Sequence, residues 1–422
     1  MIGTNRLAID GGRPVIAEPL PSGVSGPSVM AEEEIAAVAE VIRSGRLFVY
    51  PRGESVTAEF EAAACRFLGV EHALMVNSGT SALTAGLIAI GVGPGDEVII
   101  PGYTYVATAA AVLAAGAVPV IAEVDYSLGL DPEDFERNIT PHTRAVIPVH
   151  MRGIPVRLAR ILEIAEANAI TVVEDACQCV GGSYRGRPVG TYGKVAAWSL
   201  NYFKTISTGE GGLLYTNDRD IWERAALASD PGLPLWEGPE AWRNDAIPRA
   251  TNRPSEVLAA IALVQLGRLE QILAHQRSLR RTLLGALAPP RGYVLQHLDD
   301  PDGDTGGSVS VIVNDQTQAM AYARALSAEG VDAATTYNQG FPDRHIYAHW
   351  GSILEKRSPH RLGYPWNDPN YLGSVKYSRD MCPRTLDLLS RCIRFDLHMN
   401  LEPEHALLIA KALNKVDAAL GG

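Results

Sequence analysis

The sequence predicts an α/β protein in which helices sandwich a mainly parallel seven-stranded sheet, followed by a smaller C-terminal α+β domain. Two observations indicate this fold. Between residues 72 and 216, short apolar segments alternate with segments of helical periodicity, which is typical of parallel sheets covered on both faces. After residue 218 this alternation stops, and a long helical segment precedes widely spaced strand and helix signals. We therefore predict an N-terminal arm over residues 1–28, a large domain over 29–250 and a small domain over 251–422.

The elements of the large domain follow from apolar periodicity and turn residues. Two helices come first, and strands then alternate with helices. Ser78 is a suitable N-cap for the helix that follows the first strand. The predicted strands cover residues 72–76, 97–100, 118–124, 145–149, 171–174, 195–200 and 212–216. The predicted helices cover residues 31–45, 54–68, 79–90, 106–115, 132–138 and 156–169.

The C-terminal part has fewer regular signals. A strand is predicted over residues 307–313, and helices are predicted over 256–286, 318–329 and 404–420. Residues 231–248 and 337–381 are predicted to be loops. The second is dense in aromatic residues, His and Pro, and so long a loop in a compact chain is usually functional. We interpret it as part of a substrate pocket or its lid, with a surface loop as the alternative.

Composition argues against several classes of protein. The 422-residue chain has a net charge of −11, which argues against nucleic acid or an anionic membrane as the main partner. The five cysteines are an odd number in a long chain, so we expect reduced thiols rather than a disulfide framework. Cys177 and Cys179 are too close together for the usual zinc spacing, and no metal site is predicted. Residues 1–21 lack the features of a signal peptide, and we find no apolar run of membrane-spanning length, so a cytoplasmic location is expected.

Two segments that follow predicted strands have residues suited to a phosphorylated, flat ligand. In parallel sheets, ligands bind beyond the carboxyl ends of the strands. The small residues Ser78, Gly79 and Thr80 open a helix, where backbone N–H groups and the helix dipole favour a phosphate. Tyr105 follows the next strand and could stack on a flat ring. Taken singly, the first segment could be an ordinary helix cap and the second a packed loop aromatic.

Two further segments supply an acid and a lysine. Glu174 and Asp175 end an apolar strand, and a buried carboxylate needs a cationic partner, which a protonated pyridine nitrogen would provide. Lys204 lies between a strand end and the glycine-rich turn 208–212. Desolvation lowers the pKa of a lysine and makes its amine nucleophilic, whereas a lone lysine is usually a solvated surface charge. A phosphate cradle, a stacking aromatic, an acid and a lysine together match the needs of a pyridoxal 5′-phosphate (PLP) site.

In their order and spacing, these segments resemble those of the DegT/DnrJ/StrS family of sugar aminotransferases, which have the fold type I of PLP-dependent transferases. The likeness extends from about residue 30 to about residue 416. The resemblance implies that Lys204 binds the cofactor as a Schiff base and transfers protons, and that Asp175 pairs with the pyridine nitrogen. It also implies that Tyr105 stacks on the ring and that Gln178 lies near the phenolic oxygen of the cofactor. The cofactor-binding residues that it implies are Ser78, Gly79, Thr80, Tyr105, Asp175, Gln178, Ser199, Lys204 and Asn252.

The resemblance also implies a homodimer, because an Asn of the partner subunit completes the phosphate site in this family. Asn252 is the candidate, although it directly precedes Arg253, whereas the family Asn precedes an Arg by two positions. Residues 149–153 resemble the family's His-x-x-Gly segment, but Arg157 replaces the Asp that normally follows it. The segment over 338–381 is longer than in many relatives.

The function that the resemblance implies is ping-pong transamination. Glutamate or glutamine would donate an amino group to a keto-sugar, with a nucleotide-linked sugar as the first candidate, in amino-sugar or antibiotic biosynthesis. A keto-cyclitol acceptor, as in aminoglycoside pathways, is the alternative. A PLP-dependent sugar dehydratase is a further alternative, but such relatives have His at the position of Lys204.

Overall fold

A computed structural model describes residues 6–422 except 51, 232, 234–249, 339 and 341. The loop predicted over residues 231–248 therefore lies almost entirely outside the described residues. A seven-stranded sheet forms the centre of the molecule, with the strand order β1-β9-β8-β5-β4-β2-β3. Its strands are β1 (His72–Val76), β2 (Glu97–Pro101), β3 (Val118–Ala122), β4 (Thr143–Val146), β5 (Thr171–Asp175), β8 (Val195–Ser199) and β9 (Gly212–Thr216).

The sheet is mainly parallel, as the sequence predicted. β3, β2, β4, β5 and β8 pair in parallel, whereas β9 is antiparallel to both β8 and β1. The strands begin and end within a few residues of their predicted bounds. A two-stranded ribbon of β6 (Ser183–Tyr184) and β7 (Arg187–Pro188) was not predicted.

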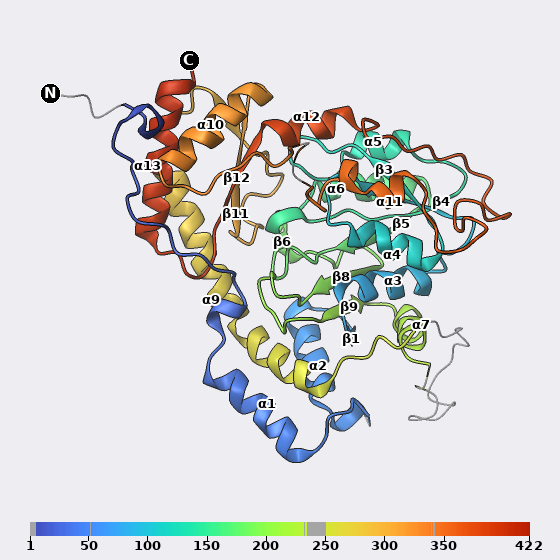
Figure 1. The fold of residues 1–422 in the computed structure, drawn as a ribbon. Helices are drawn as coiled ribbons and strands as arrows, with labels where there is room; N and C mark the ends of the chain where they lie inside the picture. The colour runs from blue at the N-terminus through green and yellow to red at the C-terminus, as the bar shows by residue number, and fades with distance from the viewer. Residues whose placement is uncertain (1–5, 51, 232, 234–249, 339, 341) are drawn as a thin grey trace.

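Helices cover both faces of this sheet (Figure 1). Along β2, Val98 and Ile100 pack into one hydrophobic cluster, whereas Ile99 packs into the other, because successive side chains of a strand point to opposite faces. The first face packs against α3 (Gly79–Ala89), α4 (Ala107–Ala115) and α7 (Arg219–Ser229). The second packs against α2 (Val56–Leu68), α5 (Pro132–Arg137), α6 (Leu158–Ala167) and part of α9 (Glu256–Gly285).

The long helix α9 joins the two halves of the molecule. It packs against α2 and α1 (Glu32–Ser44) near its start and against α13 (Pro403–Leu420) farther along (Figure 1). By length and composition it is apolar enough to cross a membrane, so the expectation that no apolar run reaches that length was wrong. Many of its residues, including Leu269 and Ile272, are nevertheless buried inside the protein. The predicted domain boundary lies at residue 250, and α9 packs against elements that come from both sides of it. The boundary therefore stays a prediction.

The C-terminal part is α+β. Its antiparallel sheet has the order β10-β11-β12 and packs against helices in a third hydrophobic cluster. The elements are β10 (Tyr293–Leu295), β11 (Ser308–Val313), α10 (Gln316–Ala328), α12 (Pro383–Arg391), β12 (Cys392–Asp396) and α13. Of these, β10, β12 and α12 were not predicted.

From residue 6 onward, the N-terminal arm is irregular apart from the 3₁₀ turns η1 (Ala8–Asp10) and η2 (Pro27–Val29). It is nevertheless fixed to the C-terminal part. Leu7 and Ile16 are buried in the third cluster, and the N–H groups of Ala8 and Val15 donate to the buried carboxylate of Glu329.

The long segment over residues 337–381 packs on the large sheet. Among its described residues, regular structure is limited to η6 (Tyr347–His349) and α11 (Gly351–Leu354). The hydroxyl of Tyr377 donates to the Pro119 carbonyl of β3 at 2.6 Å, and Tyr371 donates to buried Glu97 of β2 at 2.7 Å. Since β3 is the edge strand, this segment covers an edge that could otherwise pair with another chain.

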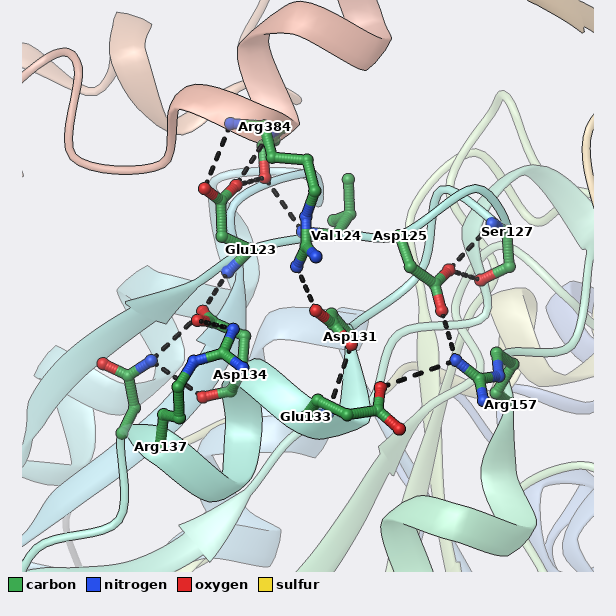
Figure 2. Close-up of polar contacts among 12 residues, drawn as sticks. Glu123, Val124, Asp125, Ser127, Asp131, Glu133, Asp134, Arg137, Arg157 and Arg384 are labelled. Atoms are coloured by element: carbon green, nitrogen blue, oxygen red, sulfur yellow. Dashed lines mark hydrogen bonds and ion pairs between the residues drawn. The ribbon is translucent and has the colours of Figure 1, made fainter.

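A polar network fixes α12 to the large sheet (Figure 2). Glu123, just after β3, accepts hydrogen bonds from the N–H groups of Arg384 and Thr385 at 3.1 and 2.7 Å, so its carboxylate lies at the N-terminus of α12. Arg157 pairs with Asp125 at 2.9 Å in the same region. Arg157, which replaces the Asp of the family pattern, thus stabilises the loop after β3.

Candidate active site

The carboxyl ends of the parallel strands open into a cavity of about 650 Å³. Eight of the nine cofactor-binding residues predicted from the sequence line it, and they come from four separate connections of the sheet. They are Ser78, Gly79, Thr80, Tyr105, Asp175, Gln178, Ser199 and Lys204. The predicted residues are therefore brought together, although the roles given to them stay predictions.

The N-terminus of α3 forms one wall of the cavity. The hydroxyl of Ser78 caps the helix by accepting a hydrogen bond from the Ser81 N–H at 3.1 Å. The N–H groups of Gly79 and Thr80 precede the first intrahelical hydrogen bond and are free to bind an anion. A Cβ atom at Gly79 would lie 2.8 Å from both Cys177 Sγ and Ser199 Cβ, so glycine is needed for this close approach.

Asp175 and Glu174 have different environments although they are neighbours on β5. Glu174 is fully buried and accepts hydrogen bonds from the N–H groups of Gly190 and Gly193 at 2.7 and 2.6 Å and from His150 Nε2 at 3.2 Å. Its role is therefore structural. Asp175 lines the cavity, and its carboxylate accepts a hydrogen bond from the Thr108 hydroxyl at 2.8 Å. This acid is thus fixed in position beside the cavity.

Lys204 is held at the opposite wall by its backbone. Its N–H donates to the Asn201 carbonyl at 3.0 Å, and its own carbonyl accepts a hydrogen bond from the N–H of Gly26 in the N-terminal arm at 3.2 Å. Burial lowers the pKa of the Lys204 amine; the charge of Asp175 opposes this effect and that of Arg152 adds to it. A larger fraction of the amine is therefore unprotonated and nucleophilic at neutral pH.

The cavity contains one thiol. Burial raises the pKa of Cys177 well above its ordinary value, so the thiol stays protonated at neutral pH and is a poor nucleophile. Lys204 is thus better suited than Cys177 to form a covalent bond with a ligand.

The long segment over residues 337–381 contributes to the cavity. His345 lines it, and its ring centroid lies 5.2 Å from that of Tyr105, with the rings inclined at 50°. Asp343 Oδ1 and His345 Nδ1 are 2.7 Å apart. These contacts place part of the segment at the cavity wall. This position agrees with the interpretation of the segment as part of a pocket rather than as a surface loop.

Asn252, the ninth predicted residue, does not line the cavity of this chain. Its carbonyl accepts a hydrogen bond from the Asn77 N–H at 2.9 Å, and its own N–H donates to the Ser229 carbonyl at 2.8 Å. Arg253, next to it, pairs with Asp230 at 2.7 Å. The role of Asn252 in a partner's site stays a prediction.

Sequence reasoning missed the part of the cavity that comes from distant segments. The N-terminal arm contributes residues 23–25, and Ser25 accepts a hydrogen bond from Gln276 of α9 at 2.7 Å. The C-terminal part contributes Thr305, Gly307, Ser308 and residues 396–398. No local pattern marks these residues, because only the fold brings them to the strand ends.

Comparison with known proteins identifies the family. The profile of the DegT/DnrJ/EryC1/StrS aminotransferase family matches residues 28–360. The chain belongs to this family. Members of the family are PLP-dependent aminotransferases, and the aminotransferase class predicted from the sequence is confirmed at this level.

The names of two similar proteins refer to different kinds of ring. The GDP-perosamine synthase of Caulobacter vibrioides is 41% identical over 221 residues, which are 51% of this chain and 57% of that protein. A protein of Streptoalloteichus tenebrarius, assigned as an L-glutamine:3-amino-2,3-dideoxy-scyllo-inosose aminotransferase, is 34% identical over 299 residues, 71% of this chain and 70% of that protein. The match to the first relative thus spans little more than half of its length.

Solved structures of similar proteins confirm the fold type I architecture. 3-Amino-5-hydroxybenzoic acid synthase superposes with a TM-score of 0.78 at 24% identity, covering 95% of this chain and 100% of that chain. The aminotransferase TlmJ of Streptoalloteichus hindustanus superposes with a TM-score of 0.75 at 26% identity, covering 93% and 98% of the two chains.

Proposed function

We propose that this family member binds PLP at Lys204 and transfers an amino group from glutamate or glutamine to a keto-sugar or keto-cyclitol. One observation carries the proposal. Lys204, Asp175 and the N-terminus of α3 line the same cavity, although they come from three different connections of the sheet.

The residues of the cavity fit PLP. The closely packed Gly79 and the free N–H groups at the start of α3 suit a phosphate. Asp175 is an acid held in place by Thr108 and is suited to pair with a protonated ring nitrogen. When bound, PLP supplies a carbonyl that takes up and returns the amino group and a ring that acts as an electron sink. Tyr105, 40% exposed at the cavity, is placed to cover a flat ring.

Lys204 would act as both anchor and base. Its lowered pKa leaves the amine partly unprotonated, so it can take a proton from the substrate carbon and return it. A base of this kind must work in both directions, because the donor loses a proton and the acceptor gains one. The hydrogen bonds of the Asn201 and Gly26 backbone fix the loop from which it acts.

The acceptor is argued from the named relatives. One is a GDP-perosamine synthase and the other is assigned to an inosose substrate, which supports a keto-sugar, nucleotide-linked, as the first candidate and a keto-cyclitol as the second. The glutamine in the second name supports glutamine beside glutamate as donor. The lysine at position 204 supports transfer over dehydration.

A homodimer with shared sites is part of the proposal. Ile35 and Ile42, seven residues apart on α1, are 62% and 61% exposed, and Phe203 beside Lys204 is 75% exposed. Large apolar side chains exposed together are typical of interaction sites. Phe203 lines the cavity, and Ile35 and Ile42 form an exposed apolar face on α1; both suit contact with a second copy of the chain that completes the site.

The proposal is tested by adding PLP to the purified protein and recording its visible absorbance. We expect a band from bound cofactor that amino donors bleach and that one class of keto compound restores. A panel of nucleotide-linked keto-sugars and free keto-cyclitols identifies the acceptor. In Lys204→Ala the covalent band should be absent while the fold is retained by circular dichroism. An unchanged band in this variant would remove Lys204 from its role.

A further inference from the structure

Arg152 is a cation at the cavity wall to which the proposed function gives no role. It lies in η4 (Met151–Gly153), directly after the continuation of β4, and lines the cavity with Gln178 and Lys204. Its backbone has φ +55° and ψ +30°, a left-handed conformation that is uncommon for a residue with a side chain. Its N–H donates to Gln178 Oε1 at 3.3 Å, and its carbonyl accepts a hydrogen bond from the Ser308 hydroxyl at 3.0 Å. Contacts from both halves of the molecule thus fix the backbone that directs this side chain.

The guanidinium of Arg152 forms no direct ion pair within the described part of the chain. Its Nε atom is buried and has no hydrogen-bond partner there. The charge of Arg152 lowers the pKa of two carboxylates, and each already has a cationic or imidazole partner: Asp343 bonds His345 at 2.7 Å, and Asp396 bonds Arg394 at 2.7 Å. Arg152 is partly buried and lines the cavity, so its unpaired guanidinium is suited to an anion that arrives with a ligand.

We propose that Arg152 binds the α-carboxylate of the amino donor and thereby fixes the position and orientation of the donor in the cavity. This inference rests on the proposed function. A guanidinium can bind a carboxylate through two parallel hydrogen bonds, which fixes its orientation as well as its position.

Among the anionic groups of the substrates, the α-carboxylate is the one that transamination requires to lie near Lys204 and hence near Arg152. The carbon that loses its proton to Lys204 carries the α-carboxylate directly, so that group must lie beside the lysine. Arg152 is close enough to Lys204 for its charge to lower the pKa of the lysine. The phosphates of a nucleotide-linked sugar are attached through the anomeric carbon and extend away from a ketone on the far side of the ring. The side-chain carboxylate of glutamate is absent from glutamine, whereas both donors share the α-carboxylate.

The test uses the PLP-loaded enzyme and measures the donor half-reaction from the absorbance of the cofactor. L-Glutamate and L-glutamine are each compared with the derivative whose α-carboxylate is a carboxamide. In the wild type we expect the carboxamides to have a KM roughly 10- to 100-fold higher, the range for a charged hydrogen bond. Arg152→Gln should raise the KM of the natural donors by a similar factor, with little effect on the KM of the carboxamides. Arg152→Lys should fall between the two.

Arg160→Gln is the matched control, because Arg160 lies on the same stretch of chain but pairs with Glu163 at the surface; its kinetics should equal those of the wild type. Unchanged discrimination between carboxylate and carboxamide in a folded Arg152→Gln enzyme would overturn the proposal. So would a variant that loses affinity only for a nucleotide-linked keto-sugar, since the anion would then be a phosphate.

A binding measurement separates this inference from the proposed function. If the wild type reacts with no amino donor, the proposed function fails. Calorimetry with 2-oxoglutarate, the keto acid of glutamate, then still tests Arg152. We expect Arg152→Gln to raise the dissociation constant roughly 10- to 100-fold, and equal constants for wild type and variant would overturn the role of Arg152.

Discussion

The geometry of the candidate site depends on the absence of a Cβ atom at Gly79. The start of α3 approaches β5 and β8 so closely that a Cβ at this position would lie 2.8 Å from two neighbouring atoms. The sequence predicted a small residue in a turn suited to a phosphate. The structure places Gly79 in the turn at the start of α3, at the wall of the cavity. The sequence could not indicate that Cys177 and Ser199 are the residues in the way, because they lie about a hundred residues or more along the chain.

Gly79→Ala is expected to weaken PLP binding by at least about tenfold, because α3 must move away from the strands to accommodate the methyl group. Fluorescence titration of the cofactor-free protein with PLP measures the dissociation constant. Gly267→Ala is the control: it lies in α9, where a Cβ would have no atom within 4 Å, and alanine favours the helix. Equal affinity in Gly79→Ala and wild type would show that close packing at this turn is unimportant.

His345 gives a prediction on pH. Burial lowers its pKa below the ordinary value of 6.5, while the hydrogen bond and charge of Asp343 raise it and the charges of Arg152 and Lys204 lower it. In Asp343→Asn the raising contribution is lost, so the imidazole should titrate at still lower pH and stay neutral over a wider range. Histidine NMR titration measures both values, with His345→Asn to assign the signal. A pKa in Asp343→Asn equal to or above that of the wild type would contradict this balance of charges.

Among the elements, those predicted correctly carry their own signals. The strands of the large sheet are built around short apolar runs, such as Val98–Ile100 in β2, and α3 has its own N-cap in Ser78. α12 was missed although Pro383 opens its first turn. Its N-cap residue, Cys382, makes no capping bond, and the N–H of Arg384 donates instead to Glu123, 261 residues earlier. β12 was missed because a short strand with two charged residues resembles a loop until β11 pairs with it.

Glu123→Gln is expected to destabilise the protein by about 1 kcal/mol, because a carboxylate at a helix N-terminus interacts with both the free N–H groups and the helix dipole. Urea unfolding measures the change. Glu163→Gln, at an exposed position within α6 and away from a helix start, should change stability far less. If both variants lost equal stability, the position at the start of α12 would have no special effect.

For the whole molecule, the sequence predicted the layered large domain and most of its site, but not how the rest of the chain closes around it. In parallel sheets, ligands bind beyond the carboxyl ends of the strands. Asp175 and Lys204 could be selected as candidate site residues because they follow such strand ends. Residues 23–25 and 396–398 reach the same cavity through packing of the third hydrophobic cluster and α9. Such contacts depend on the complete fold and have no local pattern.

The homodimer is the prediction that belongs to this scale. Light scattering should give twice the chain mass of 45.3 kDa. Ile42→Glu places a charge on the exposed apolar face of α1 and should shift the protein towards monomers and lower its activity. Leu362→Glu, at a residue 61% exposed in the long segment, serves as the control. A fully active monomer would contradict the shared site.

The hydrogen bond from Gly26 to the carbonyl of Lys204 also has a consequence for the order of events during biosynthesis. The arm that steadies the lysine leaves the ribosome before its partners at Lys204 and Gln276, which follow about 180 and 250 residues later. Contacts between parts so distant in the chain form slowly and late. We expect a nascent chain halted before α9 to be unable to retain the cofactor, so that maturation of the enzyme would wait for the synthesis of α9.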